Sequence, residues 1–109
     1  GTARAVARHY AGLVGDGVDG VRLLHPDTLV EAARWHPPTE GDPTAAGYRA
    51  LGYVLHGPEA HPGLRFGHGG YGGSMGLAEP DRELALGLVK SRMGGDLADR
   101  VIRTIDETL

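Results

Sequence analysis

The chain contains no cysteine, and this absence excludes several kinds of chemistry together. Disulfide bonds, thiolate metal sites and a cysteine nucleophile all require that residue. The absence does not indicate a compartment, because a cysteine-free protein can function on either side of a membrane. Residues 1–4 carry no signal-peptide pattern, so localisation stays open between the cytoplasm and export.

The sequence also lacks a long apolar run and an excess of basic residues. No apolar stretch approaches the length that a membrane-spanning helix needs, so we predict no membrane span. The formal net charge is −3, and no basic patch is present. Nucleic acid is therefore not an expected partner.

What remains is the composition of an ordinary globular domain. The chain has 109 residues, of which 40% are hydrophobic and 23% are charged. This length suffices for one small domain with one core. We therefore predict a single domain over residues 1–109.

Three segments have the pattern of amphipathic helices. The first runs from Thr2 to Val14, with Thr2 as its N-cap and Gly15 as its C-cap. The second begins at Pro26 and is stopped by Pro37 and Pro38. The third follows Gly94-Gly95-Asp96, and its expected apolar face consists of Leu97, Val101, Ile102, Ile105 and Leu109.

Four segments have the pattern of strands: Tyr48–Leu55, Leu64–His68, Ser74–Ala78 and Glu83–Ser91. Pro80-Asp81 suits the centre of a type I turn between the last two. Short connections between consecutive strands require antiparallel pairing. The predicted fold is therefore α+β: an antiparallel meander of three or four strands packed with N- and C-terminal helices.

The stretch Phe66–Gly76 is the most informative part of the sequence, since it holds six glycines and His68 between two apolar runs. Such glycine density in a strand pattern indicates backbone that something approaches closely, or backbone with positive φ. A substrate is one candidate for the approaching group. A titratable histidine at the same place predicts the edge of an active site.

Gly72–Gly76 formally spells the G-x-S-x-G nucleophile elbow around Ser74. That motif requires a helix directly after the serine and a catalytic histidine later in the chain. The next segment, Leu77–Glu83, has the pattern of a strand end and a turn, and no histidine follows His68. We therefore favour a second interpretation, in which these residues form one wall of a site whose nucleophile lies elsewhere.

The stretch Phe66–Glu79, together with the run Leu84–Val89, resembles the C-terminal region of the serine β-lactamase-like superfamily. The most similar branch comprises class C-type β-lactamases, D-alanyl-D-alanine carboxypeptidase-like proteins and related esterases. Thr2–Arg8 and Gly20–Thr28 are similar to segments that precede this region in the family. The resemblance implies that the chain is the C-terminal portion of a larger β-lactamase/transpeptidase-like α/β domain.

Members of that family have three signatures: a nucleophilic serine in S-x-x-K, a tyrosine in Y-x-N, and a strand bearing K-T-G or H-x-G. This chain has only the third, as His68-Gly69-Gly70, and it contains no asparagine at all. The S-x-x-K and Y-x-N regions would therefore lie outside it. The chain by itself is not expected to hydrolyse a substrate by the acyl-enzyme route.

The resemblance implies site residues His68, Gly69, Gly70 and Tyr71, with the Tyr71 N–H as one of two oxyanion donors. Gly69 where lactamases have threonine, and His68 where they have lysine, favour a small ester, amide or peptide-like substrate over a β-lactam. No cofactor or metal is implied. His56 and His61 flank a loop, but no carboxylate pair at ligand spacing accompanies them.

Three alternatives stay open. The chain can be a catalytically inactive β-lactamase-like binding module, or a complete small domain whose resemblance is only architectural. His68 can also be a half-buried strand histidine with a structural partner. If strands are missing, a sheet edge is bare, and the expected partner is the absent N-terminal segment or a second copy of the chain.

Overall fold

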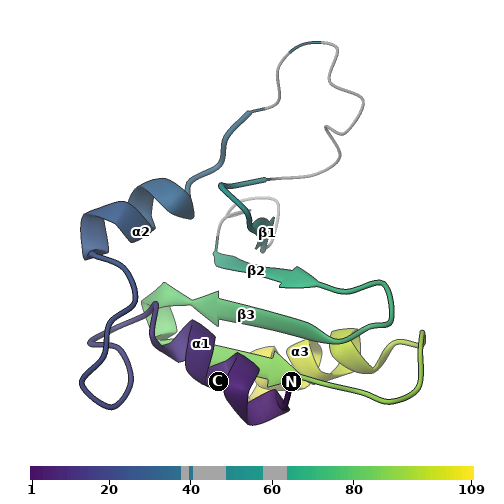
Figure 1. The fold of residues 1–109 in the computed structure, drawn as a ribbon. Helices are drawn as coiled ribbons and strands as arrows, with labels where there is room; N and C mark the ends of the chain where they lie inside the picture. The colour runs from purple at the N-terminus through teal and green to yellow at the C-terminus, as the bar shows by residue number, and fades with distance from the viewer. Residues whose placement is uncertain (38–39, 41–48, 58–63) are drawn as a thin grey trace.

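The computed structural model of the protein describes residues 1–37, 40, 49–57 and 64–109. Within these ranges the chain forms a four-stranded antiparallel sheet with strand order β1-β2-β3-β4, accompanied by three α-helices (Figure 1). The strands are β1 Val54–His56, β2 Arg65–Gly69, β3 Met75–Glu79 and β4 Leu84–Leu88. The predicted α+β class and antiparallel meander are confirmed.

Helix α1, Ala3–Ala11, begins where the sequence indicates but ends earlier. The Thr2 side chain accepts a hydrogen bond from the Ala5 N–H at 3.1 Å, so the predicted N-cap is correct. The C-cap is Gly12 rather than Gly15. Leu13 and Val14 lie beyond the helix and are nevertheless buried, because they continue its apolar face into the core.

Helix α2, Pro26–Ala32, is opened by the side chain of the preceding histidine. His25 Nδ1 accepts a hydrogen bond from the Asp27 N–H at 3.3 Å. The helix ends several residues before the expected stop at Pro37, with Ala33 as its C-cap. Leu29 is its buried anchor, whereas Trp35 lies after the helix with 44% of its surface exposed.

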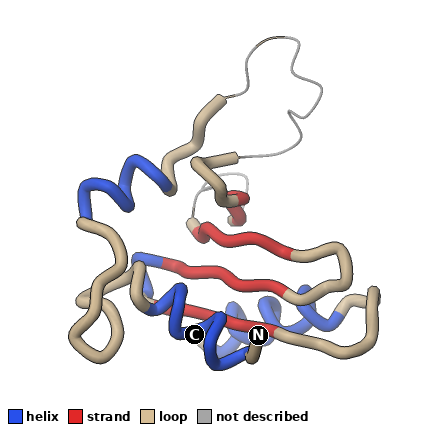
Figure 2. Tube along the Cα trace, in the orientation of Figure 1, coloured by secondary structure: helices blue, strands red, loops and turns tan. Residues whose placement is uncertain are grey.

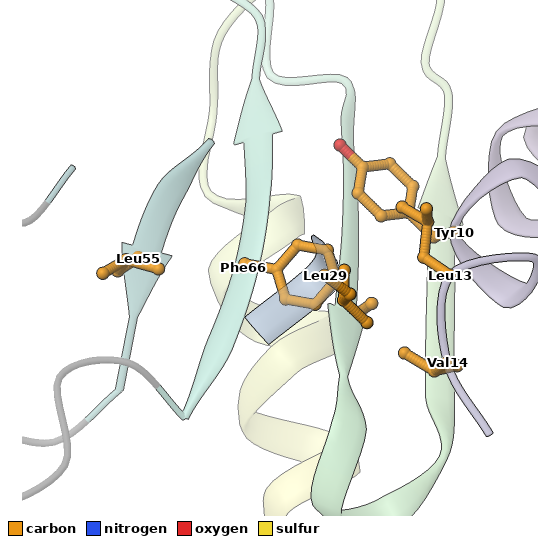
Figure 3. Packing of buried hydrophobic residues seen from close by; sticks show 7 residues of the cluster. Tyr10, Leu13, Val14, Leu29, Leu55 and Phe66 are labelled. Atoms are coloured by element: carbon orange, nitrogen blue, oxygen red, sulfur yellow. The ribbon is translucent and has the colours of Figure 1, made fainter. Parts of the chain in front are cut away.

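Helix α1 lies against one face of the sheet at two facing glycines. Gly76 in β3 pairs with Gly87 in β4, so both positions face the same side. A Cβ at Gly76 would lie 2.2 Å from Cε2 of Tyr10, and one at Gly87 would lie 2.4 Å from the Ala3 carbonyl oxygen. The helix therefore lies so close to the strands that no residue with a side chain could replace Gly76 or Gly87 without a clash. Figure 3 shows the core beneath this helix, with Tyr10, Leu13, Val14, Leu29, Leu55 and Phe66.

Strand β1 is shorter than the predicted strand Tyr48–Leu55, of which Tyr48 lies outside the described residues. Gly52 has φ +79°, and the Ala50 N–H donates to the Tyr53 carbonyl at 2.9 Å. The chain therefore turns tightly before Val54, and the strand pattern there was wrong in extent. Strand β4 is shorter than Glu83–Ser91 as well, because Glu83 has φ +50° at the end of the 3₁₀ turn η1, Pro80–Arg82.

Helix α3, Leu97–Thr108, lies on the face of the sheet opposite to α1 (Figure 2). None of its residues is buried, and of its predicted apolar face Val101, Ile102 and Ile105 are partly buried. Leu97 and Leu109 are 41% and 70% exposed. Among the described residues, no helix is long and apolar enough to cross a membrane.

Candidate functional site

His68 lies near the end of β2, at the point where the strand emerges from the core. Arg65, Phe66 and Gly67 are buried, while His68 and Gly69 are exposed. His68 pairs with Gly76, so its side chain projects from the sheet face that α1 covers. The imidazole is exposed at the margin of that face, and the alternative of a half-buried histidine with a structural partner stays open.

The residues after His68 form the tight turn of the β2–β3 hairpin. The Gly70 N–H donates to the Ser74 carbonyl at 2.8 Å, and the Gly73 N–H donates to the Gly70 carbonyl at 3.0 Å. Of the three loop residues only Gly73 has a positive φ, +97°. This is a type I turn followed by a glycine bulge, a common three-residue hairpin connection. Tyr71 is 97% exposed at its tip.

The glycines of this hairpin divide into two groups by what surrounds them. Gly67, Gly73 and Gly76 have structural reasons: a Cβ at Gly67 would lie 2.1 Å from the Gly76 carbonyl, Gly73 has positive φ, and Gly76 receives Tyr10. Gly69, Gly70 and the loop residue Gly72 have none. The nearest atoms to a Cβ there would be 4.0 Å, 3.6 Å and 3.7 Å away, which is ordinary contact distance. Gly69 and Gly70 line an open cleft of about 270 Å³ together with residues of α3, so the strand end next to His68 has room for side chains that it lacks.

The backbone N–H of Tyr71 is the one that sequence reasoning assigned to an oxyanion. Within the described residues it donates to no backbone or side-chain acceptor, whereas the N–H groups of Gly70 and Gly73 on either side of the turn are both bonded. His68, the two open glycines and this N–H follow one another along the chain. The predicted site residues are thus brought together on one exposed strand end.

An aromatic cluster supports this strand from the α1 side. The ring of Phe66 lies 5.0 Å from that of Tyr53 and 6.4 Å from that of Tyr10. Burial and the neighbouring Tyr53 raise the pKa of Tyr10, while a hydrogen bond to the His68 backbone acts in the opposite direction. The tyrosine packs beneath His68 and helps to fix the sheet there.

Ser74 is not an activated nucleophile. It directly precedes β3 rather than a helix, which excludes the nucleophile elbow on geometry. Its Oγ accepts a hydrogen bond from the Lys90 backbone N–H at 3.2 Å, a contact that joins the two strand ends. The serine therefore has a structural role in this hairpin.

His56 was not expected to bind a metal ion, and the structure places it at the end of β1, partly buried. Its Nε2 atom is buried and has no hydrogen-bond partner among the described residues. Burial, followed by the charges of Arg65 and His68, lowers the pKa of His56. His61 lies outside the described residues, and within them no group of three potential metal ligands occurs.

Sequence reasoning missed a buried ion-pair cluster that holds α3 to the sheet. Arg65 and Glu79, 8% and 2% exposed, lie opposite one another on β2 and β3, with 2.9 Å between Arg65 Nε and Glu79 Oε2. Arg82 Nε lies 2.6 Å from Glu79 Oε1, and its Nη2 lies 3.1 Å from Oδ1 of Asp106 in α3. Asp106 also binds Arg65. Only the i,i+3 spacing of Glu79 and Arg82 signals this cluster in the sequence.

The charges of this cluster balance within the molecule. The Arg82 and Arg65 guanidinium groups hold the pKa of the Glu79 carboxyl below its usual value, although burial acts against them. The same contacts with Glu79 and Asp106 raise the pKa of Arg82. The four side chains line an open cleft of about 600 Å³, but each charge already has a partner. The cluster therefore stabilises the packing of α3 on the sheet and is not a binding site.

The sequence matches no model of a known protein family, and a search of curated proteins finds no match either. The functional argument consequently depends on the chemistry and geometry of the hairpin.

Proposed function

We propose that this chain supplies one wall of the active site of a serine acyl hydrolase of β-lactamase-like type. The wall is the strand end His68-Gly69-Gly70 with the Tyr71 N–H beyond it. The attacking serine belongs to a different stretch of polypeptide. The substrate is an ester, amide or peptide-like molecule.

One observation carries the proposal: two adjacent exposed glycines, Gly69 and Gly70, that nothing in the described structure explains. Gly67, Gly73 and Gly76 are accounted for by close packing or by a positive φ, whereas Gly72, in the loop beyond the strand, has neither. A strand without side chains allows an acyl group to lie flat against the backbone, where a Cβ would obstruct it.

The reaction proceeds in two steps. The serine oxygen attacks the substrate carbonyl carbon, the leaving group departs with a proton, and an acyl-enzyme ester remains. Water then hydrolyses that ester and releases the acid. In both steps negative charge develops on the carbonyl oxygen; the Tyr71 N–H, which has no acceptor among the described residues, is the donor we assign to it.

His68 borders the same strand end. It is exposed, and its side chain projects from the α1 face of the sheet, whereas the next residue, Gly69, faces the α3 side. A histidine provides a weaker positive charge than a lysine would, and that charge depends on the pH. This favours neutral acyl substrates over those that need a permanent cation to bind a carboxylate.

The Tyr71 N–H can be removed without disturbing the turn. Tyr71 is the first central residue of a type I turn, where proline is favoured, so Tyr71→Pro deletes the donor and keeps the loop. Tyr71→Ala is the matched control, since it retains the N–H. In the protein translated from the complete reading frame, we expect Tyr71→Pro to lower the acylation rate with a p-nitrophenyl ester about 100-fold or more.

Two results would contradict the proposal. One is equal acylation by Tyr71→Pro and Tyr71→Ala. The other is ester turnover by residues 1–109 alone that disappears in Ser74→Ala. If the complete reading frame encodes no S-x-x-K and no serine that a fluorophosphonate labels, the inactive binding module replaces the hydrolase.

A further inference from the structure

The outer edge of β4 has the features of a strand that pairs with another chain. Within the described residues β4 pairs only with β3, so one side of Leu84–Leu88 presents unpaired backbone N–H and C=O groups. Exposed edges are commonly protected by lysine, proline, an inward charge or a bulge. The strand Leu-Ala-Leu-Gly-Leu contains none of these.

The side chains of β4 are also less covered than those of its neighbour. All five residues of β4 are partly exposed, whereas four of the five residues of β3 are buried. Leu84 and Leu86 lie opposite Glu79 and Leu77 and so face the α3 side of the sheet. Helix α3 by itself lines an open, mainly apolar cleft of about 280 Å³ with Leu97, Val101 and Ile105.

The charges at the two ends of β4 identify the partner. Asp81 and Glu83, both exposed, precede the strand, while Lys90 and the exposed Arg92 follow it. When two such strands pair antiparallel, the acidic end of each lies beside the basic end of the other. We infer that β4 pairs with β4 of a second copy of this chain, which joins two sheets into one across a two-fold axis.

The absence of cysteine makes the register measurable. At the two-fold axis one residue lies directly opposite its own copy, at a Cα–Cα distance of about 4.5–5.5 Å that a disulfide can bridge. Leu84→Cys, Leu86→Cys and Leu88→Cys test three possible centres on the same face of the strand. Val30→Cys, on α2 and 71% exposed, is the control.

We expect one of the three β4 variants to form a disulfide dimer at least about ten-fold faster than Val30→Cys, because the pairing holds the two thiols at a high effective concentration. In sedimentation velocity, the unmodified chain should approach twice the monomer mass as concentration rises. A chain that stays monomeric, or cross-linking no faster on β4 than on α2, would overturn the inference.

A charge exchange tests the same contact without touching the strand. Arg92→Glu neutralises the basic end of β4, where Lys90 remains, and Asp81→Arg neutralises the acidic end, where Glu83 remains. Each variant alone should dimerise more weakly than the unmodified chain, while an equimolar mixture should recover a heterodimer. No recovery in the mixture would exclude antiparallel β4 pairing. The pairing does not require that the chain belong to a hydrolase, but in a longer polypeptide an N-terminal segment competes for the same edge. A protein from the complete reading frame that stays monomeric while residues 1–109 dimerise would assign the edge to that segment and overturn the inference.

Discussion

Gly69 and Gly76 lie in the same hairpin, yet only one of them has room for a methyl group. A Cβ at Gly76 would collide with Tyr10 and Val6 of α1, whereas a Cβ at Gly69 would have nothing nearer than 4.0 Å. We expect Gly76→Ala to lower the free energy of unfolding by about 2 kcal/mol through overpacking. Gly69→Ala should stay within about 0.5 kcal/mol of the original protein.

Urea unfolding followed by circular dichroism measures both values. Equal stability of the two variants would show that α1 does not lie as close to β3 as described. Gly69→Ala is also informative for function, because it places a methyl group on the proposed acyl wall while the fold is kept.

At the level of single residues the sequence predicted the two reasons for dense glycine, but not which glycine has which reason. Dense glycine indicated close approach or positive φ, and both occur: Tyr10 approaches Gly76, and Gly73 has φ +97°. The assignment of each glycine was out of reach because the approaching ring comes from α1, at the other end of the chain. The predicted bare strand beside His68 is present as well, whereas its catalytic role stays a prediction.

Among the elements, α3 depends most on polar contacts, since none of its residues is buried. Asp106 joins it to Arg65 and Arg82 of the sheet layer. Asp106→Asn removes the charge from these contacts and should loosen α3 by about 1 kcal/mol, which makes its opening about five-fold more frequent. Native-state hydrogen exchange at the Val101 and Ile105 amides measures this change.

Glu107→Gln is the control, because that side chain is exposed on the same helix. Exchange in α1 should be unaffected by either variant. If Asp106→Asn leaves α3 exchange unchanged, apolar contacts rather than the ion pairs hold the helix.

Element positions could largely be predicted, because their signals are local. Thr2 and Pro26 mark two helix starts correctly through capping and fixed φ. The local sequence patterns failed to predict the structure where it depends on contacts between distant residues. The strand pattern before Val54 became a turn through Gly52, and the apolar face of α3 met too little sheet to be buried. The contact of Arg65 with Asp106 spans 41 residues and has no local signature.

For the whole molecule, the buried cluster links stability to pH. Contacts with Arg82 and Arg65 hold the pKa of Glu79 below its usual value, so the ionised form stabilises the fold. This contribution is complete above the unfolded pKa of about 4.3 and is lost as the pH falls through the lower folded pKa. Stability measured from pH 7 to pH 3 should decline in that window.

Glu79→Gln should remove this part of the pH dependence and cost about 3 kcal/mol at neutral pH, because two arginines lose a buried partner. Asp81→Asn is the matched control, since Asp81 is exposed. A slope that Glu79→Gln and Asp81→Asn reduce equally would assign the pH dependence to general surface charge.

The docking of α1 on β3 and β4 has a consequence for synthesis. The helix occupies residues 3–11, and the strand that receives it at Gly87 is the last of the sheet. At about 5–20 residues per second, a ribosome needs roughly 4–15 s to reach Gly87 after completing α1. Throughout that interval β4 is incomplete, so the side of the nascent helix that docks on Gly87 stays uncovered. Contacts so distant along the chain also slow folding, and the newly made polypeptide is then exposed to chaperones and proteases for longer than a helical protein of equal length.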